Sequence, residues 1–396
     1  MSQCRLCHSK PLVRFSSITF GVWLEHLNEI VRDSDDYLLG QCKQCGHVQV
    51  AAQYTPELLN KLYFNSAQEA VMWHESLISN DAPYHEMVEF ACEGHSPNTI
   101  VDFGCGEGKL LSVARAKFPK SALVGIDFND RFCQENIDYL AYNLNDLSKL
   151  PTTYWADGID LAMASHVLEH IVNPVLFLKN IASHLSVNGM IFVEVPDFSN
   201  CHDLSSIGRS NLVNLQHIHY FTLDSLRYAA NQVGLQIMSS KQVTTGYIPR
   251  LQVLVARDAN IDADEDVSSI GVRFKAAESV IHYQDNCREH RVKLAGILLE
   301  TINQDGKVGI WGIGADFYLL MKEHPALVKA IVDNQLVMFD QSLKGKTYSS
   351  RVILSSSEIP QQDYEVIICP QLAETSVKMS EVSKEWLNVR TMSYDQ

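Results

Sequence analysis

The chain of 396 residues contains no uninterrupted run of about 18 apolar residues, the length that a helix needs to cross a bilayer. Its first ten residues, MSQCRLCHSK, also lack the apolar centre of a secretory signal. These two absences argue against a membrane-spanning protein and against a secreted one. They predict a cytoplasmic protein with no membrane partner.

Positive charge is scarce: Lys and Arg number 32 against 47 Asp and Glu, so the formal net charge is −15. Nucleic-acid binding relies on cationic side chains against phosphates, so we expect no nucleic-acid partner. Ten cysteines are too few for a disulfide scaffold of this length, and in a reducing compartment they stay thiols, buried or available for metal. With 46% hydrophobic and 20% charged residues, the chain has the composition of a globular protein of more than one domain.

Four of the cysteines form two CxxC pairs, Cys4 with Cys7 and Cys42 with Cys45, separated by 34 residues. Two such turns facing each other offer four thiolates in a tetrahedron, the arrangement typical of a structural Zn²⁺ site. A thioredoxin-type redox pair would open a helix in a βαβ unit, a pattern that is not seen here. The alternatives are coincidental structural thiols, or replacement of one thiol by the adjoining His8 or His47. We predict a zinc-binding lobe over residues 1–60.

A glycine-rich turn follows the β-branched segment 99–103 and precedes a helical pattern over 109–118. Gly104, Gly106 and Gly108 permit a tight turn and a close approach of a ligand to the backbone. A second predicted strand, 122–126, ends at Asp127, about 20 residues after the turn, where a carboxylate accepts both ribose hydroxyls. The two features together predict a nucleoside-containing cofactor. Asn145 and Asp146 follow a third segment and are either adenine contacts or polar residues of a surface loop.

Further along the chain come a predicted buried strand over 159–165, an amphipathic helix over 174–185 and a core strand over 190–195. The motifs DFGCGEG, Asp127, SHVLEHI and NGMIFVEVP, in this order and spacing, resemble those of class I S-adenosylmethionine (SAM)-dependent methyltransferases over about residues 85–256. The resemblance implies SAM as cofactor, with Gly104 and Gly106 against the methionine part, Asp127 on the ribose and Asp146 near the adenine. Cys105 is otherwise a small apolar spacer. The cofactor-binding residues that we expect are Asp102, Gly104, Cys105, Gly106, Asp127, Asn145, Asp146, Ser165 and Tyr63.

Taken over its whole length, the chain resembles the three-part, zinc-containing sugar C-methyltransferases, which act on nucleotide-activated deoxysugars. In that family a tyrosine-rich segment after the zinc lobe closes over the cofactor, and Tyr63, Ser66 and Trp73 occupy comparable places. Aromatic faces attract a sulfonium by cation–π interaction, although these residues are equally well interpreted as core aromatics. The resemblance implies a methyltransferase domain over 61–257 and a linker helix with a C-terminal Rossmann-like α/β domain over 258–396.

The candidate catalytic segment is LQHIHYFT, residues 215–222. The sugar C-methyltransferases carry a His-Glu-His-x-x-Tyr-Phe pattern here, and alignment on Tyr220 places His217 on the second His, while Gln216 replaces the Glu and Leu215 the first His. Imidazole takes a proton near neutral pH, so His217 is the predicted base, with a His bonded inside a packed loop as the alternative. The further catalytic candidates are Tyr220, His166 and Glu169, followed by His219 and His170.

The C-terminal part begins with an acidic linker over 258–266 and a long helical pattern over 267–302. A strand and a second glycine turn follow, but the third dinucleotide glycine position is Phe317, which disfavours a nicotinamide site. Predicted strands over 336–340, 351–354 and 364–369 complete a small parallel sheet. Gly312, Gly314 and Asp340 are either contacts to a nucleotide-sugar or residues of a tight turn.

The predicted fold is α/β: a Rossmann-like class I methyltransferase core with a small N-terminal zinc lobe and a C-terminal Rossmann-like domain. The predicted function is SAM-dependent methyl transfer to a small polar substrate, with a nucleotide-linked sugar first. Loss of two family residues beside His217 leaves O- or N-methylation of another metabolite open. RNA methylation and a non-catalytic cofactor-binding subunit are the remaining alternatives, and the charge of −15 argues against RNA.

Overall fold

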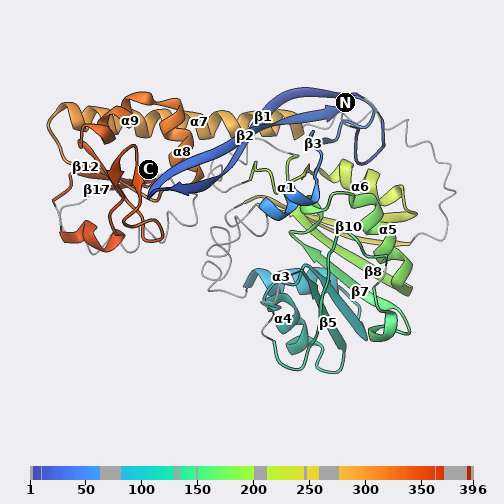
Figure 1. Ribbon diagram of the computed structural model, residues 1–396. Coiled ribbons are helices and arrows are strands. Elements are labelled where there is room, and N and C mark those ends of the chain that lie inside the picture. The colour runs from blue at the N-terminus through green and yellow to red at the C-terminus, as the bar shows by residue number, and fades with distance from the viewer. Residues whose placement is uncertain are drawn as a thin grey trace.

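The computed structural model describes residues 3–9, 11–62, 82–128, 132, 134–148, 150–199, 212–244, 248–257, 276–361, 363–369 and 390–393. Within them the chain is a mixed α/β protein with three sheets. A long N-terminal hairpin reaches from the unit that holds a seven-stranded sheet to the unit that holds a four-stranded one (Figure 1), and its residues take part in the hydrophobic clusters of both. In none of the described segments is there a helix both long and apolar enough to cross a membrane.

The hairpin consists of β1 (Leu12–His26) and β2 (Glu29–Cys42), paired antiparallel along their whole lengths. Its two-residue turn holds Leu27 at φ 50° and Asn28 at φ 71°, the left-handed conformations that match the twist of a tight hairpin. Next come the short strand β3 (Val48–Val50) and helix α1 (Pro56–Asn60), which Thr55 caps by accepting from the Leu58 backbone N–H. The predicted small lobe is thus an extended arm with both CxxC pairs at its open end, one before β1 and one at the end of β2.

The arm recruits short strands from distant parts of the chain. β3 pairs with β9 (His219–Tyr220), and the start of β2 pairs with β14 (Thr347–Tyr348), which turns into β15 (Arg351–Val352). The predicted strand over 351–354 is therefore wrong in its partner: residues 351–352 join the arm, and Leu354 makes only an isolated bridge to Phe339. The Glu29 carboxylate, at the start of β2, accepts from Thr347 and from the Ser350 backbone and so fixes this turn on the arm.

The seven-stranded sheet has the order β10-β11-β8-β7-β4-β5-β6. Strands β4 to β8 are mutually parallel, and β11 runs antiparallel to β8. The strands are β4 (Thr99–Phe103), β5 (Ala122–Asp127), β6 (Asp138–Ala141), β7 (Ile159–Ser165), β8 (Leu185–Pro196), β10 (Leu235–Val243) and β11 (Arg250–Arg257).

Helices cover both faces of this sheet and enclose two hydrophobic clusters. One cluster joins the sheet to α3 (Ala82–Ala91) and α4 (Lys109–Lys117), and the other joins it to α5 (Pro174–His184) and α6 (Leu223–Asn231). Two 3-10 turns, η2 (Thr152–Tyr154) and η3 (Leu168–His170), lie in the connections. This three-layer arrangement is the Rossmann-like core predicted from the strand and helix patterns.

The order of the parallel strands places a switch point beside β4. The chain moves from β4 to β5 on one side and later returns to β7 on the other. In open α/β sheets, ligands bind in the crevice at the carboxyl ends of the strands at such a point. The glycine turn after β4, Asp127 at the end of β5 and Ser165 at the end of β7 all lie at this edge.

The C-terminal unit starts with α7 (Ala276–Asn303), which agrees with the end of the predicted helix; residues 267–275 lie outside the described part. Its sheet has the order β13-β12-β16-β17 and is wholly parallel, as expected, although the fourth strand was not predicted. The elements are β12 (Val308–Trp311), α8 (Ala315–Glu323), α9 (Pro325–Val332), β13 (Leu336–Phe339), η6 (Ser356–Gln361), β16 (Val366–Cys369) and β17 (Arg390–Ser393).

Candidate functional site

The glycine turn after β4 is held tightly against the neighbouring loops. Gly104, at φ 81°, donates its N–H to the Ile126 carbonyl at 2.7 Å, and a Cβ at this position would lie 2.2 Å from Cγ2 of Val167. Only glycine fits both the left-handed backbone and this contact. Gly106, at φ 52°, differs, because a Cβ there would meet no described atom within 4 Å. The turn thus leaves open space beside a backbone segment that a ligand can approach.

Asp127 faces this turn from the end of β5. Its Oδ2 accepts the Gly106 N–H at 2.9 Å and its Oδ1 accepts the Phe128 N–H at 2.7 Å. These two backbone bonds hold the carboxylate toward the glycine turn. Asp102 at the end of β4 is 3% exposed, and burial together with repulsion from Asp127 raises the pKa of Asp102 to about 8. The residues present therefore fit a ribose beside the glycine turn.

The other predicted cofactor residues near the turn have different surroundings. Asn145 accepts the Val172 N–H at 2.8 Å and so ties the loop after β6 to the segment after β7. Asp146 is exposed and accepts from Ser148. Cys105 is buried with its Sγ next to Gly125, which agrees with the spacer interpretation, and burial raises the pKa of its thiol. The predicted aromatic cover of Tyr63, Ser66 and Trp73 lies outside the described residues.

A buried polar network starts where β7 ends. Ser165 donates its hydroxyl to Oε1 of Glu194, and Gln252 donates to Oε2 of the same carboxylate at 2.6 Å. The His166 ring lies between two buried carboxylates, with Nδ1 3.3 Å from Oε1 of Glu169 and Nε2 3.3 Å from Oε1 of Glu194. Burial opposes protonation of this ring, but the two carboxylates outweigh it and raise the pKa of His166 to about 10. His166 is therefore an imidazolium that holds both carboxylates in place.

His217, the predicted base, lies next to this network and contacts His170. Its Nδ1 is 2.7 Å from the Leu212 carbonyl, and its ring contacts the ring of His170 edge to face at a centroid distance of 4.9 Å. Burial, with the charge of His170, lowers the pKa of His217 to about 4, so the ring is neutral at pH 7. The ligand atoms of Glu169, His170 and His217 all lie within 4.8 Å of one another.

Tyr220 and His219 have structural surroundings. Tyr220 is fully buried, packs edge to face on Phe198 and donates its hydroxyl to the Asn214 carbonyl at 3.2 Å. His219 is 1% exposed and lies 3.0 Å from the Ile171 carbonyl. Neither side chain shares the three-residue cluster around His217.

Sequence reasoning undervalued His170 and missed Glu194. His170 stood among the last of the catalytic candidates, yet its Nε2 is 3.9 Å from Oε1 of Glu169. Glu194 gave a signal that could have been used, because it is the single charged residue of the apolar strand segment MIFVEV. A carboxylate is rarely fully buried without a partner, so such an interruption indicates a polar network.

The four N-terminal cysteines come together at the base of the arm. Cys4 Sγ is 3.6 Å from Cys45 Sγ, Cys7 Sγ is 3.4 Å from Cys42 Sγ, and all four sulfurs lie within 4.8 Å of one another. Each CxxC turn is followed by a residue in the left-handed conformation, His8 at φ 58° and Gly46 at φ 72°. The donor set and its compactness fit a four-coordinate metal ion.

The two histidines beside the turns do not take part in this cluster. His8 is exposed, and His47 is fully buried with its Nε2 2.8 Å from Nδ1 of His219. The alternative in which one of them replaces a thiol is therefore not supported, because the four sulfurs already form the set. Tyr228 lies near the thiols, and burial together with their charge raises the pKa of its hydroxyl to about 12.

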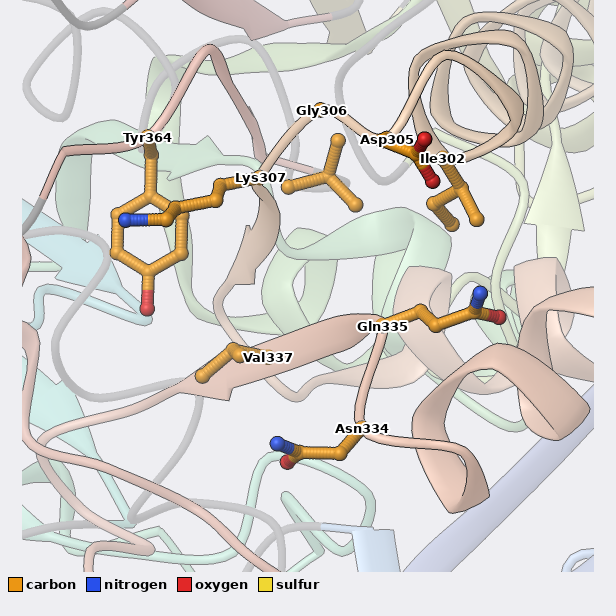
Figure 2. Close-up of a pocket in the computed structure, with 9 residues that line it drawn as sticks. Ile302, Asp305, Gly306, Lys307, Asn334, Gln335, Val337 and Tyr364 are labelled. Carbon is orange, nitrogen blue, oxygen red and sulfur yellow. The ribbon is translucent and has the colours of Figure 1, made fainter.

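The C-terminal sheet has fewer candidate binding groups than the methyltransferase sheet among the described residues. Asp340 accepts the Ile313 N–H on Oδ2 and the Ser342 and Leu343 N–H groups on Oδ1, so its carboxylate is used within the turn. A cavity of about 340 Å³ lies at the opposite, amino ends of β12 and β13. Figure 2 shows Lys307 and Tyr364 on one side of it and Asn334 and Gln335 on the other. Ligands of parallel sheets gather at the carboxyl ends, so this cavity is not at the expected position.

Comparison with known proteins matches residues 80–240 to the family described as methyltransferase domain. An uncharacterized 37.1 kDa protein in transposon TN4556 of Streptomyces fradiae is 24% identical over 62% of this chain and 68% of its own length. A trans-aconitate 2-methyltransferase of Methylobacterium nodulans is 27% identical over 26% of this chain and 40% of its own. The plantazolicin methyltransferase BpumL, solved with a substrate analog and SAH, is 14% identical over 50% of this chain and 94% of its own, with a TM-score of 0.41.

The sheet order, the glycine turn facing Asp127 and the family match define the central part of the molecule. It is a class I SAM-dependent methyltransferase domain, and the enzyme class of the chain is that of the SAM-dependent methyltransferases. The chain spans only 40% of the length of the trans-aconitate methyltransferase that it matches.

Proposed function

We propose that this protein transfers the methyl group of SAM to a small polar acceptor, with a nucleotide-activated sugar as the leading class. The observation that carries the proposal is the pairing of Asp127 with the Gly106 N–H at the switch point of the sheet. When bound, SAM supplies an electrophilic methyl group on a sulfonium. Asp127 would hold the ribose, Gly104 and Gly106 would line the methionine part, and Asp146 would approach the adenine.

Activation of the acceptor falls to the cluster of Glu169, His170 and His217 in this proposal. The carbonyl of Leu212 accepts the Nδ1–H of His217, so the lone pair of the neutral ring is on Nε2. If only side chains of the protein take part, Nε2 of His217 takes the acceptor proton, and the Glu169 carboxylate stabilises the resulting imidazolium. Tyr220 would support the loop by its packing, and His166 would orient Glu169.

At position 216 the chain has Gln where the sugar C-methyltransferase pattern has Glu. The amide of Gln216 donates to the Leu62 carbonyl at 3.0 Å, so this side chain is used in packing. We infer that Glu169 supplies the carboxylate that is missing at position 216. Methylation of carbon is then still accessible, because the acid–base pair is rebuilt from a different element. Methylation of oxygen or nitrogen is the second candidate, since the base at His217 serves either.

The remaining parts are assigned by the same proposal. The four thiols Cys4, Cys7, Cys42 and Cys45 would hold one structural Zn²⁺, because a site with four protein ligands leaves no open position for chemistry. The domains would be the zinc-binding unit over 1–60, the methyltransferase domain over 61–257 and the C-terminal Rossmann-like unit over 258–396. The last of these would hold the nucleotide of the substrate.

The proposal is tested first by calorimetric titration with SAM and with its demethylated product. Replacing Asp127 by Ala removes two ribose hydrogen bonds to a charged group, each contributing about 1.5–3 kcal/mol, so we expect binding at least a hundredfold weaker. Asp138→Ala, at an exposed position on the neighbouring strand β6, should leave the affinity unchanged. A folded wild-type chain with no affinity for SAM would refute the proposal.

The acceptor is tested by mass spectrometry of nucleotide-sugars incubated with SAM and enzyme. We expect a gain of one methyl group with the wild type and none with His217→Ala. Carbon methylation additionally requires exchange of a substrate C–H with deuterium from solvent before the methyl donor is added. Methyl transfer without such exchange would indicate an oxygen or nitrogen nucleophile.

A further inference from the structure

The cluster of Glu169, His170 and His217 is built from two segments that the fold brings together. Glu169 and His170 end η3, which begins three positions after the last residue of β7, and one residue separates His217 from β9. The Ile218 N–H donates to the Glu169 carbonyl at 2.8 Å and so fixes one segment on the other. The side chains therefore meet through a rigid backbone contact at the carboxyl edge of the methyltransferase sheet.

The hydrogen bonds of the two imidazoles determine which nitrogen is available. Nδ1 of His170 is 2.9 Å from the Gln216 carbonyl, and Nδ1 of His217 is 2.7 Å from the Leu212 carbonyl. A carbonyl only accepts, so each Nδ1 carries the hydrogen and each neutral ring has its lone pair on Nε2. A backbone carbonyl that orients one ring nitrogen in this way is the usual second partner of a metal-binding histidine.

Glu169 adds an independent observation. The residue is 1% exposed, and among the described residues its Oε2 has no hydrogen-bond partner. Its Oε1 lies 3.3 Å from His166 and 3.9 Å from Nε2 of His170. A buried carboxylate oxygen without a partner is costly, and it points to a ligand that the chain itself does not provide.

We propose that Glu169, His170 and His217 bind one divalent first-row transition-metal ion through a carboxylate oxygen and the two Nε2 atoms. This inference rests on the proposed function and deepens it. Two imidazoles and one carboxylate leave coordination positions open, which is the arrangement of a site that binds substrate. The acceptor would place an oxygen on the ion, so that an enolate or alkoxide is stabilised as it forms.

A hydroxide on the ion takes the proton of the acceptor and departs as water, and the acceptor oxygen takes its place. The electron pair of the acceptor attacks the methyl carbon, the bond from sulfur to methyl breaks, and the sulfonium becomes a thioether. In this form His217 acts on the acceptor as a ligand of the ion instead of by direct proton transfer.

The experiment uses the full chain with its thiolate site loaded, titrated with Co²⁺ and followed by absorbance and by total metal content. Cobalt on thiolates gives an intense near-ultraviolet band, whereas cobalt on nitrogen and oxygen gives only weak visible bands, so the two sites are separable. We expect one equivalent of the second kind in the wild type. His217→Gln and, separately, His170→Gln should weaken its binding at least tenfold. His184→Gln, at the last residue of α5 and outside the three-residue cluster, should leave it unchanged.

Thermal unfolding and SAM titration of each variant exclude misfolding as the cause of a loss. A wild-type chain that binds SAM but takes up cobalt only on thiolates would overturn the metal site while leaving the proposed function intact. Equal uptake by the wild type and both histidine variants would overturn it as well. If the wild type itself does not bind SAM, the proposed function is refuted instead.

Discussion

Nε2 of His47, directly after the second CxxC turn, lies 2.8 Å from Nδ1 of His219, two residues after His217. His219 Nε2 faces the Ile171 carbonyl at 3.0 Å and must donate to it, so its Nδ1 accepts and the His47 Nε2–H donates. Both rings are buried and neutral, since burial lowers the pKa of His47 to about 3 and holds that of His219 well below its usual value. The cysteine cluster is thereby connected to the loop that positions the proposed acceptor site.

This connection predicts that loss of the cysteine cluster reaches the methyltransferase site. In Cys4→Ser we expect loss of about one equivalent of tightly bound metal, a lower melting temperature and lower methyl transfer, because metal binding at such sites contributes folding free energy directly. Metal content by mass spectrometry and thermal unfolding measure the effect. Cys287→Ser, on helix α7 away from the cluster, should retain the metal. Full metal content in Cys4→Ser would contradict the four-thiol site.

Gly104 and Gly94 form a matched pair for testing the glycine turn. Both have positive φ, 81° and 74°, but a Cβ at Gly104 would lie 2.2 Å from Val167, whereas at Gly94 it would meet no described atom within 4 Å. Replacement by Ala brings backbone strain of about 1–2 kcal/mol at either position and an added clash only at Gly104. We therefore expect Gly104→Ala to weaken SAM binding more than tenfold and Gly94→Ala to leave it unchanged, as measured by calorimetry. Equal affinities would show that the contact with Val167 is not needed.

From the raised pKa of Asp102 we expect the free energy of unfolding to depend on pH. The pKa of its carboxyl is about 8 in the folded chain, because of burial and repulsion from Asp127, and 3.8 in a free side chain. The folded state therefore keeps a proton that the unfolded state has lost, and this contribution to stability is complete below pH 3.8 and is lost as the pH rises through 8. Denaturant titrations at pH 5 to 9 should show a steeper fall in unfolding free energy for the wild type than for Asp102→Asn. Parallel curves would contradict the raised pKa.

Trp23 attaches the arm to the C-terminal unit, and its replacement tests how firmly. Its Nε1 donates to the Ile313 carbonyl at 2.8 Å, and its ring packs on Phe317 and Tyr348. Trp23→Ala should lower the free energy of unfolding by about 2–4 kcal/mol, near the range for buried aromatic truncations. Leu24→Ala, whose side chain is half exposed on the same strand, should lower it by less than about 1 kcal/mol. Similar denaturation midpoints for the two variants would mean that the arm does not depend on this contact.

Local patterns in the sequence were sufficient wherever the feature itself is local. The CxxC spacing predicted the cluster, because each turn places two sulfurs by its own backbone geometry. The glycine turn and Asp127 were predictable because parallel strands end at one edge of a sheet, so residues just after them meet. The class of the central domain followed from the same motifs.

Only the tertiary structure decided four features: the arm, the partner of Arg351–Val352, the link between His47 and His219, and the meeting of Glu169 with His217. In each case the partners come from segments far apart in the chain, and sequence periodicity reports which face of an element is buried but not what covers it. The residues by themselves determined a SAM-dependent methyltransferase core and a cysteine cluster. The pairing of β3 with β9 decided that the methyltransferase core and the cysteine cluster lie together. Strand pairing fixes side chains to within a few ångströms of each other, and no local pattern encodes that pairing.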